Sequence, residues 1–214
     1  MNRPVIALDA DGVLVDYNLA YARAWERAFG VYPVERDPHA YWAIDRWGVE
    51  RLEGERLQQL RDCLDEAFWS NMQAMPRAVD ACHALHEAGY ELVCVSALHG
   101  RYAEARAHNL RALGFPIDRI VATGRAVDHR SPKADAVASL QPAAFVDDYL
   151  PYFTGVEGDV HKALVMRGNT GSPNQGEGLG MIHSQHTDLA DFAAWWLNES
   201  GKHAIARPLG KEKQ

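Results

Sequence analysis

The sequence has few cysteines, no long apolar run and no phosphate-binding loop of the GxxxxGK[ST] type. Its three cysteines, Cys63, Cys82 and Cys94, are far apart and form no CxxC pair. This usage favours reduced, buried thiols and a cytoplasmic setting over a disulfide framework. Because no apolar segment approaches the length of a membrane span, and a strand is expected within four residues of Met1, we expect neither an anchor nor a signal peptide.

Positive charge is also scarce, since 22 lysines and arginines face 29 aspartates and glutamates, for a formal net charge of −7. This balance argues against a nucleic-acid partner. A small anionic substrate stays open, because a bound cation can dominate the field inside one cleft. The 214 residues suffice for one hydrophobic core and a small accessory domain, and they contain no internal repeat.

The segment around which the chain is organised is VIALDADGVLVD, from Val5 to Asp16. Its apolar start predicts a strand buried on both faces, and Asp9 and Asp11 follow with the same orientation, ahead of Gly12. Ligands of open α/β sheets bind beyond the carboxyl ends of strands. Two carboxylates there repel each other unless a hard cation such as Mg²⁺ relieves the repulsion, although an Asx-rich turn without a site is an equal alternative.

The segment after this strand differs in periodicity. Apolar spacing predicts helices over 17–29 and 49–69, and we interpret 16–75 as a small helical insertion. Four of the six tryptophans lie in it, accompanied by Tyr41: Trp25, Trp42, Trp47 and Trp69. Most of these rings are expected to form the core of the insertion, and some could stack on a flat substrate group.

Beyond Pro76, predicted strands and helices alternate. Helices are expected over 77–88, 102–113, 133–140 and from Thr187 or Asp188 to Asn198, and strands over 91–95, 119–123, 143–146 and, as the last strand, 162–166. Residues 167–180, rich in Gly, Asn and Ser, are expected to form a flexible loop. The alternation predicts an α/β fold with a doubly wound, mainly parallel sheet, built from 1–15 and 76–200, followed by a flexible tail over 201–214.

Further polar residues stand at the ends of these elements. Ser96 ends a strand, Lys133 begins a helix where a lysine is unfavourable to the helix dipole, and Asp147 and Asp148 end the strand of AFVDD. Each has an ordinary explanation alone, namely a helix cap for the serine and an exposed side chain for the lysine. A second acidic pair beyond a strand of the same sheet is compatible with a magnesium site.

These polar residues, in their order along the chain, resemble the motif set of haloacid dehalogenase-like (HAD) phosphatases: Asp9 with Asp11, then Ser96, Lys133 and finally Asp147 with Asp148. The resemblance implies a Rossmann-like core with a helical cap inserted after the first strand. It also implies an enzyme that hydrolyses phosphate monoesters, because family members with other chemistries differ at the position of Asp11.

The resemblance further implies the roles of the residues. Asp9 is the nucleophile and forms an aspartyl phosphate, and Asp11 is the general acid and base. Ser96, Ala97 and Lys133 bind the phosphate. Mg²⁺ is held by Asp9, the backbone carbonyl of Asp11 and Asp148, with Asp147 behind Asp148.

The substrate is less sharply indicated. The first motif with Val13 and Asp16, the run from Phe68 to Pro76 and the VSAL stretch loosely resemble 5'-deoxyribonucleotidases, which suggests a nucleoside monophosphate. A sugar phosphate, phosphoglycolate, a phosphomutase reaction or a non-catalytic HAD-like binding module are the alternatives. Two histidine pairs, His83 with His86 and His183 with His186, lack suitably spaced further ligands, so a metal site at either is disfavoured.

Overall fold

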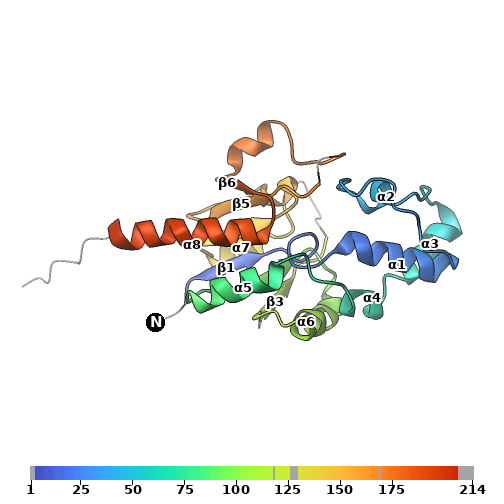
Figure 1. Cartoon of the computed structure of the whole chain (residues 1–214), viewed down its shortest axis with the longest axis horizontal. Helices are drawn as coiled ribbons and strands as arrows, with labels where there is room; N and C mark the ends of the chain where they lie inside the picture. The colour runs from blue at the N-terminus through green and yellow to red at the C-terminus, as the bar shows by residue number, and fades with distance from the viewer. Residues whose placement is uncertain (1–2, 118, 126–129, 169, 207–214) are drawn as a thin grey trace, which may run out of the picture.

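The computed structural model describes residues 3–117, 119–125, 130–168 and 170–206. A parallel sheet with the strand order β3-β2-β1-β4-β5-β6 lies at its centre (Figure 1). The strands in the described residues are β1 (Val5–Leu8), β2 (Glu91–Ser96), β3 (Arg119–Ala122), β4 (Ala144–Asp147), β5 (His161–Val165) and β6 (Ser184–His186). The predicted α/β class with a parallel sheet is confirmed, and β1 lies in the middle, between β2 and β4.

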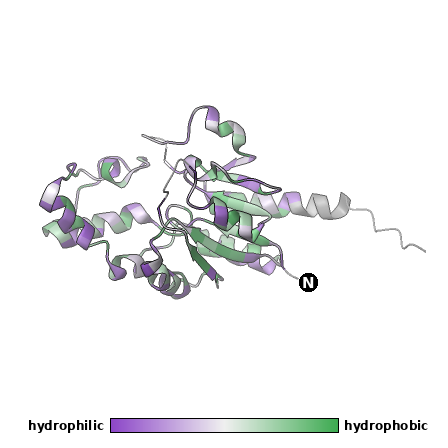
Figure 2. Ribbon diagram, turned by 180° about the vertical axis from the view of Figure 1, so that it is seen from behind, coloured by the Kyte–Doolittle hydropathy of each residue, from purple (hydrophilic) through white to green (hydrophobic). Residues whose placement is uncertain are grey.

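Helices cover both faces of this sheet, as the alternation of strand and helix requires. Ile6 and Leu8 of β1 share a cluster with apolar residues of α5 (Ala78–Glu87), α6 (Ala103–Ala112) and α8 (Leu189–Ala206). Ala7, between them, joins a second cluster with α7 (Ala134–Leu140). The central strands β1, β2 and β4 are largely apolar because both of their faces are covered (Figure 2).

Four helices form the insertion after β1, at the end of the molecule away from the C-terminal helix (Figure 1). They are α1 (Tyr17–Phe29), α2 (Ala43–Arg46), α3 (Gly54–Asp62) and α4 (Glu66–Ser70). The chain enters and leaves side by side, since the N–H of Asp16 donates to Gln73 O at 2.9 Å and the N–H of Met75 to Leu14 O at 2.8 Å. The domain boundaries stated above stay predictions.

The helix over 17–29 is confirmed residue for residue by α1. Asp16 caps it by accepting from the N–H of Leu19 at 2.9 Å, and Gly30 ends it in a left-handed conformation. The single helix expected over 49–69 is wrong, because α3 ends at Asp62 and α4 begins afresh. Asp65 caps that second helix by accepting from the N–H of Phe68 at 2.9 Å.

Two further expectations are corrected at the C-terminal side. The strand β5 is not the last, because β6 pairs with it in parallel. The final helix continues past Asn198 to Ala206, so residues 201–206 of the predicted tail are helical, whereas 207–214 lie outside the described residues. Within the predicted loop over 167–180 the structure has a short 3₁₀ helix, η3 (Glu177–Met181). In the described ranges, none of the helices combines the length and apolar character needed to cross a bilayer.

Candidate active site

Asp9 and Asp11 lie directly beyond β1, at the carboxyl edge of the sheet. The N–H of Asp9 donates to Val146 O at 2.9 Å, which continues the pairing of β1 with β4. The backbone then turns at Gly12, whose φ of +92° lies in the left-handed region that side chains rarely adopt. A Cβ there would collide with Arg167 and Asp148. The glycine therefore lets the first acidic turn lie against the second acidic pair.

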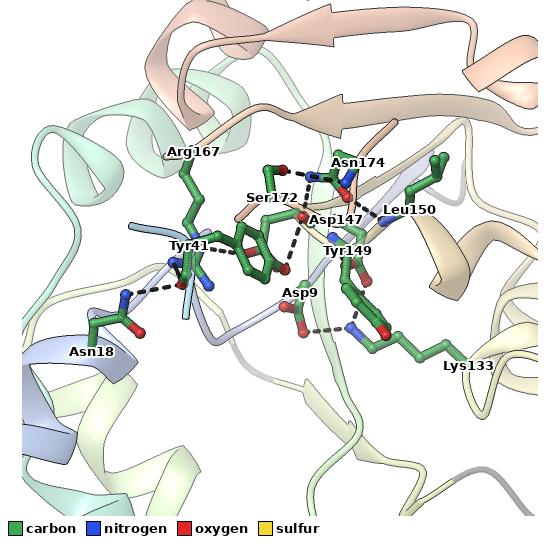
Figure 3. Close-up of polar contacts among 11 residues, drawn as sticks. Asp9, Asn18, Tyr41, Lys133, Asp147, Tyr149, Leu150, Arg167, Ser172 and Asn174 are labelled. Carbon is green, nitrogen blue, oxygen red and sulfur yellow. Dashed lines mark hydrogen bonds and ion pairs between the residues drawn. The ribbon is translucent and has the colours of Figure 1, made fainter. Parts of the chain in front are cut away.

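Lys133 is the buried cation of the site, and its side chain has no exposed surface. Its N–H donates to Ser131 Oγ at 3.1 Å, at the start of α7. Its Nζ donates to Asp9 Oδ1 and, at 2.6 Å, to Asp147 Oδ2 (Figure 3). Burial lowers the pKa of Lys133, but the carboxylates of Asp147 and Asp9 outweigh it and hold that pKa above its ordinary value. The ammonium group therefore remains charged beneath Asp9.

Asp147 and Asp148 are neighbours in sequence with different surroundings. Asp147 is bound to Lys133, and its Oδ1 accepts from the N–H of Tyr149 at 2.9 Å. Asp148 instead accepts from Arg167 Nε through Oδ2. Burial raises the pKa of Asp148 to about 6, against the lowering effect of Arg167. The two carboxylates therefore have different cationic partners, Lys133 for Asp147 and Arg167 for Asp148.

A group of oxygen ligands is present among these acids. Asp9, Asp147 and Asp148 each offer a carboxylate oxygen, and these atoms lie within 4.8 Å of one another. Oxygen donors of this kind suit a hard cation such as Mg²⁺. The described ranges contain no other such cluster of His, Cys, Asp or Glu ligands, and the histidine pairs of the sequence form none. His83, for example, is hydrogen-bonded to Gly114 O at 2.9 Å.

A pocket of about 750 Å³ is lined by residues of both the sheet edge and the insertion. The predicted site residues that line it are Asp9, Asp11, Ser96, Ala97 and Asp148. Lys133 and Asp147 are not among the lining residues and reach the pocket through Asp9. Ser96 is 1% exposed, and its carbonyl accepts from the N–H of Thr123 at 2.9 Å.

The rest of the lining is rich in aromatic rings: Tyr17, Tyr21, Tyr41, Trp42, Tyr149 and Tyr152. Of the four tryptophans of the insertion, Trp42 is the one that lines the pocket, and it is 42% exposed. Trp25 and Trp47 are buried, as expected for an internal core. The cavity has the size of a small-molecule site, and its lining combines these rings with charged side chains of aspartate and arginine.

Three polar residues of the site were missed by sequence reasoning. Arg106 of α6 donates from Nη2 to Asp11 Oδ1 at 2.6 Å. Arg167 donates from Nη1 to Tyr41 O at 3.1 Å, and Asn174 from Nδ2 to Asp148 O at 2.7 Å (Figure 3). The last two lie in the segment predicted as a flexible loop. For Arg106 a signal existed, because it shares a helix face with Leu110, four residues on.

The loop that carries Arg167 also docks the insertion onto the sheet. Tyr41 donates its N–H to Thr170 O at 3.0 Å, and Thr170 donates its own N–H to His39 O at 3.2 Å. The hydroxyl of Tyr41 donates to Asp148 O at 3.2 Å. The insertion is thus fastened to the second acidic pair itself, so the pocket and the acidic cluster form one site.

A parallel sheet with acidic pairs beyond β1 and β4, and a buried lysine between them, defines a Rossmann-like α/β protein with a carboxylate site at its carboxyl edge. The model of a family described as haloacid dehalogenase-like hydrolase matches residues 4–150, and the chain belongs to that family. A search of curated proteins found no match.

Solved structures share the fold over most of the chain. A HAD family hydrolase from Deinococcus radiodurans R1 with bound phosphate and sodium has a TM-score of 0.60 at 18% identity, over 94% of this chain and 98% of that one. A "predicted phosphoglycolate phosphatase" from Haemophilus somnus 129pt has a TM-score of 0.60 at 15% identity, over 91% of this chain and 98% of that one. An L-2-haloacid dehalogenase has a TM-score of 0.54 at 16% identity, over 91% of this chain and 100% of that one. At these identities the likeness establishes the fold.

Proposed function

We propose that this chain is a magnesium-dependent phosphomonoesterase that works through an aspartyl phosphate on Asp9. The observation that carries the proposal is the ion pair of Asp9 with Lys133, a fully buried lysine, at the edge of a pocket that Asp11 also lines. Membership of a hydrolase family supports the reaction class.

Each acid of the first pair has its own step. A carboxylate oxygen of Asp9 attacks phosphorus and the ester bond to the leaving oxygen breaks, while Asp11 gives that oxygen a proton. Asp11 then takes a proton from the water that hydrolyses the acyl phosphate, which releases inorganic phosphate and restores Asp9. A halide leaves carbon without needing a proton, so an acid at position 11 favours an ester substrate over a haloacid.

The remaining site residues hold charge. Ser96 and Ala97, which line the pocket, bind the phosphoryl oxygens, where one such contact contributes about 3 kcal/mol in other enzymes, and the ammonium group of Lys133 supplies positive charge beneath Asp9. Asp9, Asp148 and the backbone carbonyl of Asp11 would hold Mg²⁺, which would supply positive charge to neutralise the phosphoryl oxygens. Asp147 stays with Lys133 and orients it. The closely grouped carboxylate oxygens and the position of Asp148 in the pocket lining support this division.

The proposed substrate is a small phosphorylated metabolite, with a deoxynucleoside or nucleoside monophosphate first among the candidates. Trp42, which is 42% exposed, offers a ring face for a base in the pocket lining. A sugar phosphate or phosphoglycolate is the competing class. A cytoplasmic setting belongs to the same proposal and is supported by free cysteines, of which Cys82 and Cys94 are buried.

The test is phosphate release from a panel of nucleoside, deoxynucleoside and sugar monophosphates and phosphoglycolate, with Mg²⁺ and with EDTA. We expect release that needs Mg²⁺ and disappears in Asp9→Asn. The matched control is Asp135→Asn, which changes an aspartate on α7 whose side chain is 86% exposed. It should keep wild-type turnover.

Near-native activity in Asp9→Asn would contradict the mechanism. Chloride release from an L-2-haloacid without phosphate release would assign the dehalogenase class instead. Transfer of phosphate to a second sugar hydroxyl would identify a mutase, and inactivity on every compound would favour a binding module.

A further inference from the structure

Arg106 is a charged residue in a fully buried place. It lies on α6, and its side chain has no exposed surface. Its Nη2 donates to Asp11 Oδ1 at 2.6 Å, whereas the Asp11 side chain is 29% exposed and lines the pocket. The pair is therefore one-sided, because the arginine is enclosed in protein and the carboxylate reaches the site.

The other contacts of Arg106 are weak for a buried guanidinium group. Nη1 donates to the thioether sulfur of Met72 at 3.3 Å, and the guanidinium carbon lies 5.3 Å from the ring centroid of Trp69. Nε has no hydrogen-bond partner among the described residues. A buried ion pair with incomplete hydrogen bonding contributes little net stability compared with apolar side chains. Packing alone therefore does not explain an arginine at this position.

Arg106 also connects Asp11 to the segment by which the chain returns from the insertion. Met72 lies on that segment, and α6 holds it twice, through Arg106 and through Asn109 Nδ2, which donates to Met72 O at 2.9 Å. The same segment pairs with the turn after Asp11, since Val15 and Ala74 form an antiparallel bridge. Arg106 thus contacts both Asp11 and the segment by which the chain returns from the insertion.

We propose that Arg106 is a positioning residue for Asp11. Arg106 binds Oδ1 of Asp11 from the buried side. The other oxygen, Oδ2, accepts no hydrogen bond within the described ranges and is the one presented to the substrate and to water. This inference rests on the proposed function, in which Asp11 moves the proton of the leaving group. A misplacement of about 1 Å in such a group costs roughly 10²-fold in rate.

The experiment compares two substrates in the first turnover of Arg106→Met, a neutral variant that can pack against Met72 and Trp69. Formation of p-nitrophenolate from p-nitrophenyl phosphate needs no proton, whereas cleavage of an alkyl phosphate does. With the alkyl phosphate that the wild type hydrolyses fastest, we expect a roughly 10²-fold loss in first-turnover rate. With p-nitrophenyl phosphate the loss should be less than about threefold, and KM should change little for either.

The matched control is Asn109→Ala, on the same helix, which removes a Met72 contact without touching Asp11. It should slow both substrates equally, and Arg106→Lys should recover part of the alkyl phosphate rate. Equal losses with the two substrates in Arg106→Met, or an unchanged rate, would overturn the inference while leaving the proposed function in place. An inactive wild type, or an active Asp9→Asn, would overturn the proposed function and this inference with it.

Discussion

The Nζ atom of Lys133 lies 2.6 Å from Asp147 Oδ2, and neither side chain is exposed to solvent. Asp9 is bound to the same ammonium group. One cation thus serves two carboxylates in a region of low dielectric, where an unpaired charge is costly. This arrangement fixes which acid of the consecutive pair is held in the interior and which, Asp148, remains at the pocket.

Lys133→Met should destabilise the fold as well as abolish turnover, because it leaves Asp9 and Asp147 as uncompensated buried charges. Removal of one partner of a buried pair costs about 3–5 kcal/mol in the free energy of unfolding. Urea unfolding without divalent cation measures this cost. Arg130→Met, which breaks an exposed pair with Asp135, should cost less than about 1 kcal/mol. Similar values for the two variants would contradict a buried charge network.

Gly12→Ala should inactivate the protein, because the new methyl group meets Arg167 and Asp148 at a φ of +92°. Gly89→Ala provides the control, since its φ of +98° carries the same backbone strain and nothing lies within 4 Å of the added carbon. Backbone strain alone costs on the order of 1 kcal/mol. We expect Gly12→Ala to lose more stability than Gly89→Ala and to lose phosphate release, whereas Gly89→Ala keeps it. Equal stability and activity in both would rule out the steric explanation.

Trp42→Ala tests whether the aromatic lining binds a base. Stacking on one ring contributes about 1–3 kcal/mol, so KM for a nucleoside monophosphate should rise about tenfold or more. KM for glycerol 2-phosphate, which has no ring, should stay within about twofold. Tyr32→Ala removes another exposed ring of the insertion, one that contacts Trp47 and does not line the pocket. It should leave both KM values unchanged, and a parallel rise for both substrates in Trp42→Ala would argue against stacking.

His161 should make the protein less stable in acid. Burial, with the nearby His183 and His186, lowers the pKa of His161 from 6.5 to about 4. Between about pH 6.5 and 4, the unfolded chain therefore binds a proton at His161 that the folded chain does not bind. The free energy of unfolding falls as the pH drops through this range. In urea unfolding across this range, His161→Gln should lose less stability than the wild type. Parallel curves for His161→Gln and the wild type would exclude His161 as a source of the acid sensitivity.

Much of the sheet was predictable because its strands carry strong local signals. The apolar run from Val5 to Leu8 and the alternating elements after Pro76 specify buried parallel strands without reference to the rest of the chain. The strand β6 escaped prediction because its three residues, all of them polar, form no apolar run. The break at Asp65 was predictable in principle, since an aspartate three residues before Phe68 is a helix cap.

The site was predictable where residues follow strand ends, and not where distant segments meet. Asp9, Ser96 and Asp148 line one pocket because parallel strands end at the same edge. Arg167 follows β5 by two residues, so the same rule could have placed it at this edge, whereas Asn174 reaches the edge only through tertiary packing of a segment whose composition is typical of a loop. Arg106 was missed because a charged residue in a helix is usually solvated, and its burial depends on the partner carboxylate 95 residues away.

The hydrogen bond from Asp16 to Gln73 has a topological consequence. It holds the two ends of the intervening segment together, and this segment therefore forms a closed loop that leaves the sheet and returns to it at the same place. Lengthening such a closed loop costs little entropy, about 0.6 kcal/mol per doubling. Helices can therefore be added, removed or exchanged between these two residues without altering the register of β1 against its neighbours, and the selectivity of the pocket can diverge while its chemistry stays in place.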